Sequence, residues 1–148
     1  MIDIEITGTE ELKRKLEGLT NGVANEILRG ALYENALDIK DEMVGACHVS
    51  ENGVHFEKIK TRNHEAGTLA RSIRVLVDKV RGNYPTIWVK PVKGQGDPDG
   101  WYAKFLEYGT RFHAPHPFIR PTYDRMQSQV REGIDAIVRE DIKKYMES

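Results

Sequence analysis

The sequence contains a single cysteine, Cys47, and lacks several other common features. One cysteine excludes an intrachain disulfide framework and favours a reducing compartment. No apolar run approaches the ~20 residues that span a bilayer, and the first residues carry acids where a signal peptide would be apolar. The net charge of −1 gives no overall attraction to nucleic acid or membranes. These absences predict a protein that is made in a cytoplasm and has no membrane partner.

Sequence motifs for catalysis are also lacking. The glycines of GQGDPDG, 94–100, precede neither a predicted helix nor a Lys-Ser/Thr pair, which argues against a phosphate loop. Cys47 has no positioned base, because the adjacent His48 would point elsewhere on a helix. Asp97 and Asp99 lie in a predicted turn, where loop solubility explains them. We interpret the chain as a non-enzyme that requires no cofactor.

Two histidines provide the main alternative. His113 and His116 are three residues apart, and Glu107 precedes them. A zinc site needs three or four ligands on a fixed frame, whereas the proline in HAPH disfavours a helix, so the two rings need not share a face. Histidines on a surface or at a helix end are the favoured interpretation. A metal-dependent hydrolase that uses these three side chains stays open as a rival.

Periodicity predicts most of the elements. Alternating isoleucines at 2–6 predict a strand, Thr9 is placed to cap a short helix, and apolar residues spaced by three and four predict a helix over 21–46. SIRVLVDKV and TIWVKPV, rich in β-branched residues, predict a hairpin. The polar segment 47–66 predicts a flexible arm, and 93–100 a second loop.

The last third of the chain predicts two helices joined by a stiff corner. WYAKFLEY, 101–108, predicts a short helix that Gly109 ends, because glycine adopts positive φ at little cost. Three prolines hold the following stretch extended, and Pro121 can be the first residue of a long terminal helix. The predicted fold is therefore a single α+β domain over 1–148. In it, a small antiparallel β-sheet packs against two long helices and one or two short ones.

The stretch YAKFLEYGT…PHPFIRPTYD, together with GTLARSI at 67–73, resembles a tail-component family of tailed phages and prophages. The family is named after the gene ten product of a lambda-like siphophage, and its members are assigned to tail completion or head–tail joining. The tight matches cover 67–73 and 102–121. The matched corner residues are Tyr102, Ala103, Glu107, Tyr108, Gly109, Thr110, Pro117, Phe118, Arg120 and Pro121.

The resemblance implies a structural role for this corner. Phe118 is expected to fill the gap between the two helices, and the side chains of Glu107 and Arg120 to form a charge-assisted pair. His113 and His116 then lie on the rim of the bend without a metal.

The function that the resemblance implies is that of a structural virion protein. We expect a ring-forming neck adaptor, made in the host bacterial cytoplasm, whose partners are copies of itself and other phage neck or tail proteins. The 47–66 arm and the 93–100 loop would become ordered on contact with neighbours.

Charge is divided unevenly along the chain. Residues 1–44 hold ten acids against five bases, and residues 57–93 hold nine bases against three acids. If these segments lie on opposite sides of the subunit, ring neighbours can meet acid to base, with Arg71, Arg74 and Lys79 as possible interface residues. Alternatively, the basic segment faces packaged DNA passing through the neck. A nucleic-acid-binding module that uses 57–93 is a further alternative function.

Overall fold

The computed structural model describes residues 4–5, 21–47, 67–78, 85–94 and 98–148, and it confirms the predicted α+β fold. The elements of this part are β1 (Ile4–Glu5), α2 (Asn21–Ala46), α3 (Thr68–Ser72), β2 (Ile73–Val77), β3 (Ile87–Pro91), α4 (Ala103–Tyr108) and α5 (Ile119–Glu147). None of the described helices is long and apolar enough to cross a membrane.

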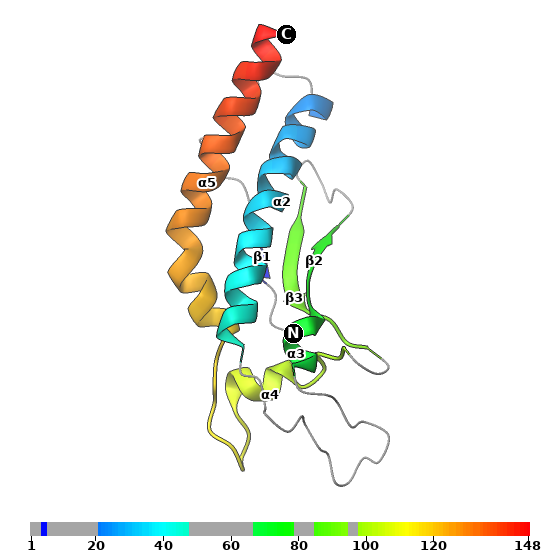
Figure 1. The fold of residues 1–148 in the computed structure, drawn as a ribbon, viewed down its shortest axis with the longest axis vertical. Helices are drawn as coiled ribbons and strands as arrows, with labels where there is room; N and C mark the ends of the chain where they lie inside the picture. The colour runs from blue at the N-terminus through cyan, green and yellow to red at the C-terminus, as the bar shows by residue number, and fades with distance from the viewer. Residues whose placement is uncertain (1–3, 6–20, 48–66, 79–84, 95–97) are drawn as a thin grey trace.

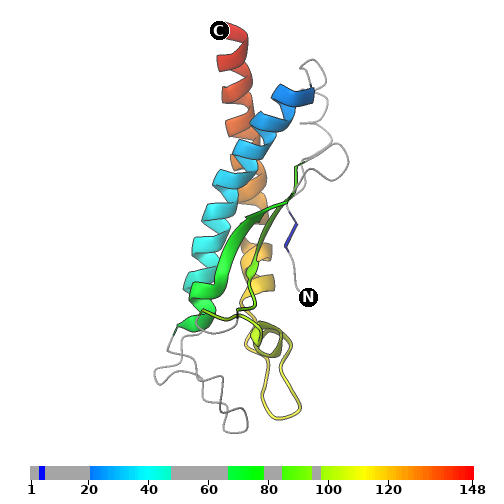
Figure 2. The ribbon, with the colours of Figure 1, turned by 90° about the vertical axis from the view of Figure 1, so that its right-hand side faces the viewer.

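Helix α2 lies between the other large elements. In Figure 1 it runs beside α5 on one side and beside the β2–β3 hairpin on the other. Figure 2 shows the hairpin in front of α2 and α5 behind it. Helix α4 and the loop that leads into α5 lie at one end of this layered body, and the C-terminus lies at the other.

The described strands form an antiparallel sheet in the order β1-β3-β2, which confirms the predicted hairpin. Ile73 lies opposite Pro91, and Val77 lies opposite Ile87. The bond from the Val92 N–H to the Ser72 carbonyl, 2.9 Å long, places that neighbouring pair in the hydrogen-bonded register. Hydrogen-bonded and non-bonded pairs alternate along an antiparallel ladder. Pro91 therefore occupies a non-bonded pair, where its missing N–H removes no bond to β2.

The core is formed mainly where α2 and α5 face each other and the strands. Apolar residues of α2 recur at helical spacing, and those of α5 recur every four residues along one stripe. The buried members are Leu28, Ala31, Leu32, Ala36, Ile39 and Met43 of α2, with Met126, Val130, Ile134 and Val138 of α5. Each fully buried large aliphatic side chain contributes about 1.5–3 kcal/mol, so this stripe is the main attachment of α5 to the body.

Several expectations need correction or lie outside the described residues. The terminal helix begins at Ile119, two residues before Pro121, and the short helix α3 was not predicted within GTLARSI. Five residues are too few to establish a helical period, and α3 follows Gly67, which has a φ of 78°. The helix expected after Thr9, residues 48–66 of the arm, and Lys79 lie outside the described part.

The contact of α5 with α2 at Gly133 yields a testable prediction. A Cβ at Gly133 would overlap the buried carboxamide of Asn35, whose Nδ2 donates to the Ala31 carbonyl at 2.9 Å. Gly133→Ala should therefore lower the free energy of unfolding by about 1–2 kcal/mol despite the better helix propensity of alanine.

The matched control is Gly30→Ala in α2, where no atom lies within 4 Å of the added Cβ. It should raise the free energy of unfolding by about 0.5–1 kcal/mol. Urea denaturation of both variants measures the difference, and equal stabilisation by the two would contradict this packing.

Candidate functional site: the Glu107 corner and the groove beside α2

A buried carboxylate connects α4 to α5. Glu107, in the last turn of α4, is only 6% exposed. Its Oε2 accepts hydrogen bonds from the main-chain N–H groups of Phe118, at 2.8 Å, and Ile119, at 3.0 Å. Its Oε1 accepts the N–H of Arg120 at 2.8 Å. One side chain thus satisfies three successive donors at the start of α5.

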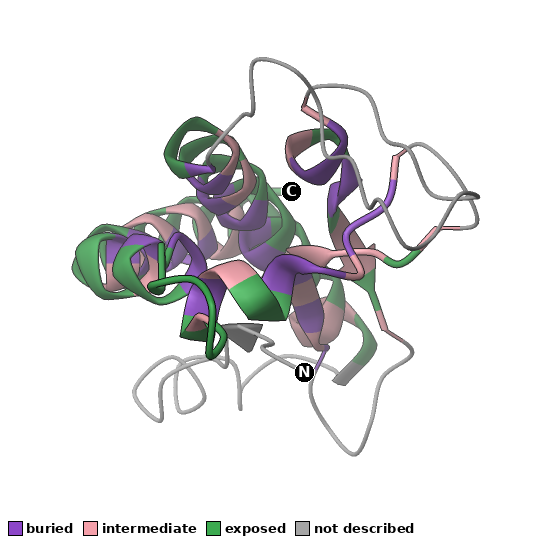
Figure 3. Ribbon diagram, turned by 90° about the horizontal axis from the view of Figure 1, so that it is seen from below, coloured by how far each residue is buried: buried purple, intermediate pink, exposed green. Residues whose placement is uncertain are grey.

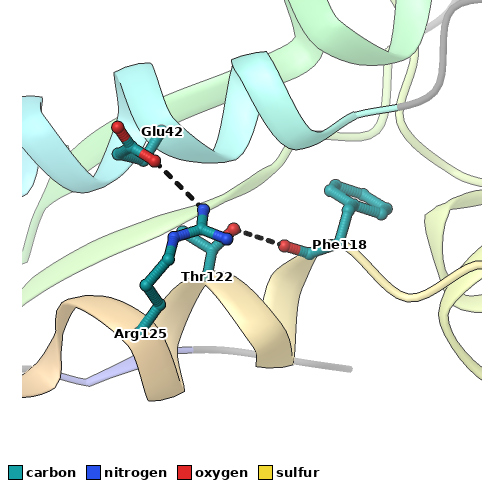
Figure 4. Close-up of polar contacts among 4 residues, drawn as sticks. All are labelled: Glu42, Phe118, Thr122 and Arg125. Carbon is teal, nitrogen blue, oxygen red and sulfur yellow. Dashed lines mark hydrogen bonds and ion pairs between the residues drawn. The ribbon is translucent and has the colours of Figure 1, made fainter.

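These bonds complete the N-terminal end of α5. The first N–H groups of a helix have no acceptor within the helix, and a negative charge there is favoured by the helix dipole. Pro121 comes next and has no N–H that requires a partner. One residue further on, the Thr122 hydroxyl donates to the Phe118 carbonyl at 2.6 Å (Figure 4). Glu107 therefore caps α5 from another helix.

This geometry corrects one sequence prediction and refines another. Glu107 binds the main chain of Arg120, whereas the expected pair between the two side chains is not formed; the Arg120 side chain is exposed. Pro121 is the third residue of α5 and not the first. The cause is the same in both cases: the carboxylate reaches the main chain, so the helix is capped two residues before the proline.

The turn after α4 requires glycine, as predicted. Gly109 has φ 73° and ψ 179°, a combination that is essentially restricted to glycine. A Cβ there would lie 2.8 Å from the Pro115 nitrogen and 2.9 Å from the His113 carbonyl oxygen. The main-chain N–H of His116 also donates to the Leu106 carbonyl at 2.7 Å. The chain leaves α4 and returns across it within a few residues.

The loop between the helices is ordered by its own hydrogen bonds. Thr110 and His113 exchange two main-chain bonds, of 2.9 and 3.3 Å, and the Thr110 hydroxyl accepts the N–H groups of Phe112 and His113. The Phe112 ring is nevertheless 77% exposed, and the Arg111 guanidinium lies 4.8 Å from its centre. Figure 3 shows the loop that joins α4 to α5 as an exposed projection. The corner thus presents an aromatic and cationic tip.

The predicted corner residues divide into buried and exposed groups. Phe118 is 2% exposed, which confirms the expected burial of its ring, and Tyr102 and Ala103 are also buried. Exposed members are Tyr108, Thr110, Pro117, Arg120 and Pro121. The buried residues hold the corner, and the exposed residues lie on its surface.

The corner does not bring the proposed metal ligands together. His113 and His116 are exposed, while both carboxylate oxygens of Glu107 are occupied by main-chain N–H groups. Among the described residues, no three His, Cys, Asp or Glu side chains form a group that could hold a metal ion. Burial raises the pKa of the Cys47 thiol to about 11, so little of the nucleophilic thiolate is present near neutral pH.

Asp99 was expected to be a solvated loop residue, and that expectation is wrong. Its side chain is 1% exposed, and its Oδ1 accepts the N–H groups of Gly94, at 3.0 Å, and Trp101, at 3.1 Å. The Asp99 N–H donates to the Thr68 hydroxyl at 3.0 Å. The sequence signal that was available is an Asp-Gly pair, since aspartate commonly accepts nearby main-chain N–H groups in turns.

A groove of about 590 Å³ lies between α2 and the segment formed by α3 and β2. Its lining residues are Tyr33, Leu37, Lys40, Asp41 and Val44 of α2, with Ala70, Arg71, Ile73, Arg74 and Val75 opposite. Two of the predicted interface residues, Arg71 and Arg74, therefore lie on its wall. Asp41 comes from the acidic segment and lines the same groove. The assumption that the acidic and basic segments lie on opposite sides of the subunit is wrong for these residues.

Comparisons with known proteins give no match: no protein-family model, curated protein or solved structure matches the chain. The similarity of 67–73 and 102–121 to the tail-component family therefore rests on those residues alone.

The cap predicts a large effect of removing one carboxylate. Glu107→Ala leaves three donors without their acceptor and should lower the free energy of unfolding by about 3–5 kcal/mol. Glu107→Gln keeps one acceptor oxygen but turns an amide donor toward an N–H group, so a loss of about 2 kcal/mol is expected.

Urea denaturation of the two variants measures these losses. The matched control is Glu132→Ala, at an exposed position of α5, which should change the stability by no more than about 0.5 kcal/mol. A Glu107→Ala variant as stable as the control would show that the cap does not hold α5.

Proposed function

We propose that the chain is a structural protein of a tailed bacteriophage or prophage virion. Its role is that of a tail-completion or head–tail joining adaptor in the neck, assembled as a ring of identical subunits. The observation that carries the proposal is the Glu107 corner. Glu107, Phe118 and Arg120, which belong to the stretch that resembles the tail-component motif, are joined by the hydrogen bonds of one buried cap, and this cap supports the loop that carries Phe112.

An adaptor benefits from contacts that are ordered before binding. Preorganisation reduces the entropy lost on association, and exposed aromatic side chains are frequent anchors of interfaces. Phe112 is held by the hydrogen bonds of its loop, and Tyr108, which is 70% exposed, lies just before the turn. These features support a role of the tip in binding a neighbour in the neck, where other tail or head proteins would be the partners.

The rival function of a metal-dependent hydrolase is less well supported. It requires Glu107 as a ligand, yet that carboxylate is buried and accepts three hydrogen bonds from α5. Drawing it toward a metal shared with the histidines would leave those three N–H groups without an acceptor. The corner favours a structural use of Glu107 over a catalytic one.

The nucleic-acid alternative depends on the basic 57–93 segment. In its described part, Arg71 and Arg74 share the groove with Asp41, and Lys90 lies 5.4 Å from the ring centre of Trp88. An acid beside the arginines weakens the local positive potential that a phosphate backbone requires. Steeply salt-dependent binding of duplex DNA by the purified protein would favour this alternative over the adaptor.

The adaptor proposal predicts that the tip is needed for assembly and not for folding. Phe112→Asp, introduced into the phage or prophage that carries this gene, should leave the melting temperature of the purified protein unchanged. Particles from the same strain should show unjoined heads and tails in electron micrographs. The phenyl ring of Phe112 is mostly in solvent in the free protein, so replacing this side chain costs little stability.

The control is Tyr145→Asp, which places the same charge on an exposed aromatic residue of α5 far along the chain from the corner. It should give joined particles. Normal particles from the Phe112→Asp strain would contradict the role of the tip, and stoichiometric zinc in the purified protein would contradict the adaptor as a whole.

A further inference from the structure

The groove and the surface of α2 beside it carry three groups of side chains, which we call strips. The base strip consists of Lys40, Arg71 and Arg74; the apolar strip of Tyr33, Leu37 and Val44; and the acid strip of Glu34, Asp38 and Asp41. We call this surface the striped face. It brings together residues of the acidic and basic segments, and the Glu107 corner uses none of them.

The geometry of α2 sets the order of the strips. Glu34, Asp38 and Asp41 follow one another at i, i+4 and i+7, so they share one line along the helix. The apolar strip occupies the adjacent line, toward the groove and β2. On the far side of the acid strip, the Glu42 carboxylate binds Arg125 of α5 at 3.0 Å (Figure 4). The acid strip therefore runs between the groove and α5.

The acid strip forms no ion pair within 4 Å in the described part of the chain, although Glu34 interacts electrostatically with Lys144 of α5. The described ion pairs join Glu42 to Arg125 and residues within α5 to one another, and none includes a member of the acid strip. Two apolar side chains beside them are also accessible, with Tyr33 43% and Leu37 37% exposed. An apolar strip bordered by charges of opposite sign on its two sides has the composition of a binding surface.

We propose that the striped face binds a second copy of this chain in a two-fold symmetric dimer, with the axis along the apolar strip and parallel to α2. A rotation of 180° about such an axis exchanges the two sides of the face. The acid strip of each copy then meets the base strip of the other, twice in each dimer. The apolar strips meet at the axis, and the two α2 helices run in the same direction.

Charge selects the second copy as the partner. Three acids and three bases on one face complement the same face on another molecule, as a symmetric interface requires. A nucleic acid on this face would contact the acid strip as well as the bases, and the carboxylates would repel its phosphates. An axis perpendicular to α2 would place acids against acids, which is unfavourable.

This dimer does not depend on the proposed virion function. The tip of the corner and the striped face are formed by different residues, and a neck adaptor could be stored as a dimer before assembly. A failure of the dimer would leave the role of Phe112 in particles unaffected, and the reverse also holds.

Charge reversal tests the acid-to-base contact directly. Arg71→Glu/Arg74→Glu makes the face acidic, and Asp38→Lys/Asp41→Lys makes it basic; all four positions are exposed. Each double variant alone should have a dimer dissociation constant at least about 100-fold higher than the wild type. Mixed in equal amounts, the two variants should form a heterodimer, because every acid again meets a base. Sedimentation equilibrium of the full chains measures this.

The control is Arg131→Glu/Lys143→Glu, a reversal of the same size at exposed positions of α5 outside the corner, which should dimerise like the wild type. A wild-type protein that stays monomeric at all accessible concentrations overturns the proposal. A mixture of the two variants that stays monomeric also overturns it. Oligomers larger than dimers in that mixture overturn the two-fold arrangement in favour of a head-to-tail contact.

Cysteine cross-linking tests the direction of the axis independently of charge. Residues on the axis meet their own counterparts, so Tyr33→Cys and Leu37→Cys should each give a disulfide-linked dimer under mild oxidation. The native Cys47 is buried and its raised pKa makes it a poor nucleophile, which leaves the introduced thiol as the reactive one. Glu132→Cys on α5 is the control and should stay unlinked. Linkage at Leu37 without linkage at Tyr33 would overturn the parallel axis.

Discussion

The start of α5 depends on the buried carboxylate of Glu107, and the position of α5 determines much of the rest. A carboxylate that is 6% exposed is costly unless its charge is compensated, and the N–H groups at the start of a helix are costly unless they find an acceptor. The N–H groups compensate the charge of the carboxylate, and the carboxylate is the acceptor that these N–H groups need. The hydrogen bonds from these N–H groups to Glu107, of 2.8 to 3.0 Å, fix α4 against the N-terminus of α5 and so bring Phe118 into the core. They also fix both ends of the loop that exposes Phe112.

Features that depend on local patterns were predictable from the sequence. The apolar spacing along 21–46 gave α2 its observed bounds, and the two β-branched segments gave the hairpin. Gly109 could be assigned because positive φ is a property of one residue. The start of α5 was missed by two residues, because its cap comes from a side chain eleven positions before Phe118. The burial of Asp99 was missed for a similar reason, since Thr68, more than thirty residues away, lies against it.

The candidate surfaces show the same division between local pattern and packing. The charge asymmetry of the sequence identified Arg71 and Arg74 as residues of interest, and both line the groove. The sequence could not place them relative to Asp41, because that depends on how β2 packs beside α2. In the structure the two charges border one groove. The contact expected between two copies of the chain therefore has a different symmetry. Charges on opposite sides of a subunit favour a head-to-tail contact, whereas charges of both signs on one face favour a two-fold contact.

Helix α2 shows what the proposed second copy would cover. A surface helix of a globular domain commonly has one apolar stripe, toward the core, and a polar remainder. Leu32, Ile39 and Met43 form such a stripe toward α5 and the strands. Tyr33, Leu37 and Val44 form a second apolar line that is only partly covered, with acids along one side of it. A helix with two apolar lines has two packing surfaces, and within the described part of the chain the fold fills one of them. In the proposed dimer, this second line is the part of α2 that the other copy covers.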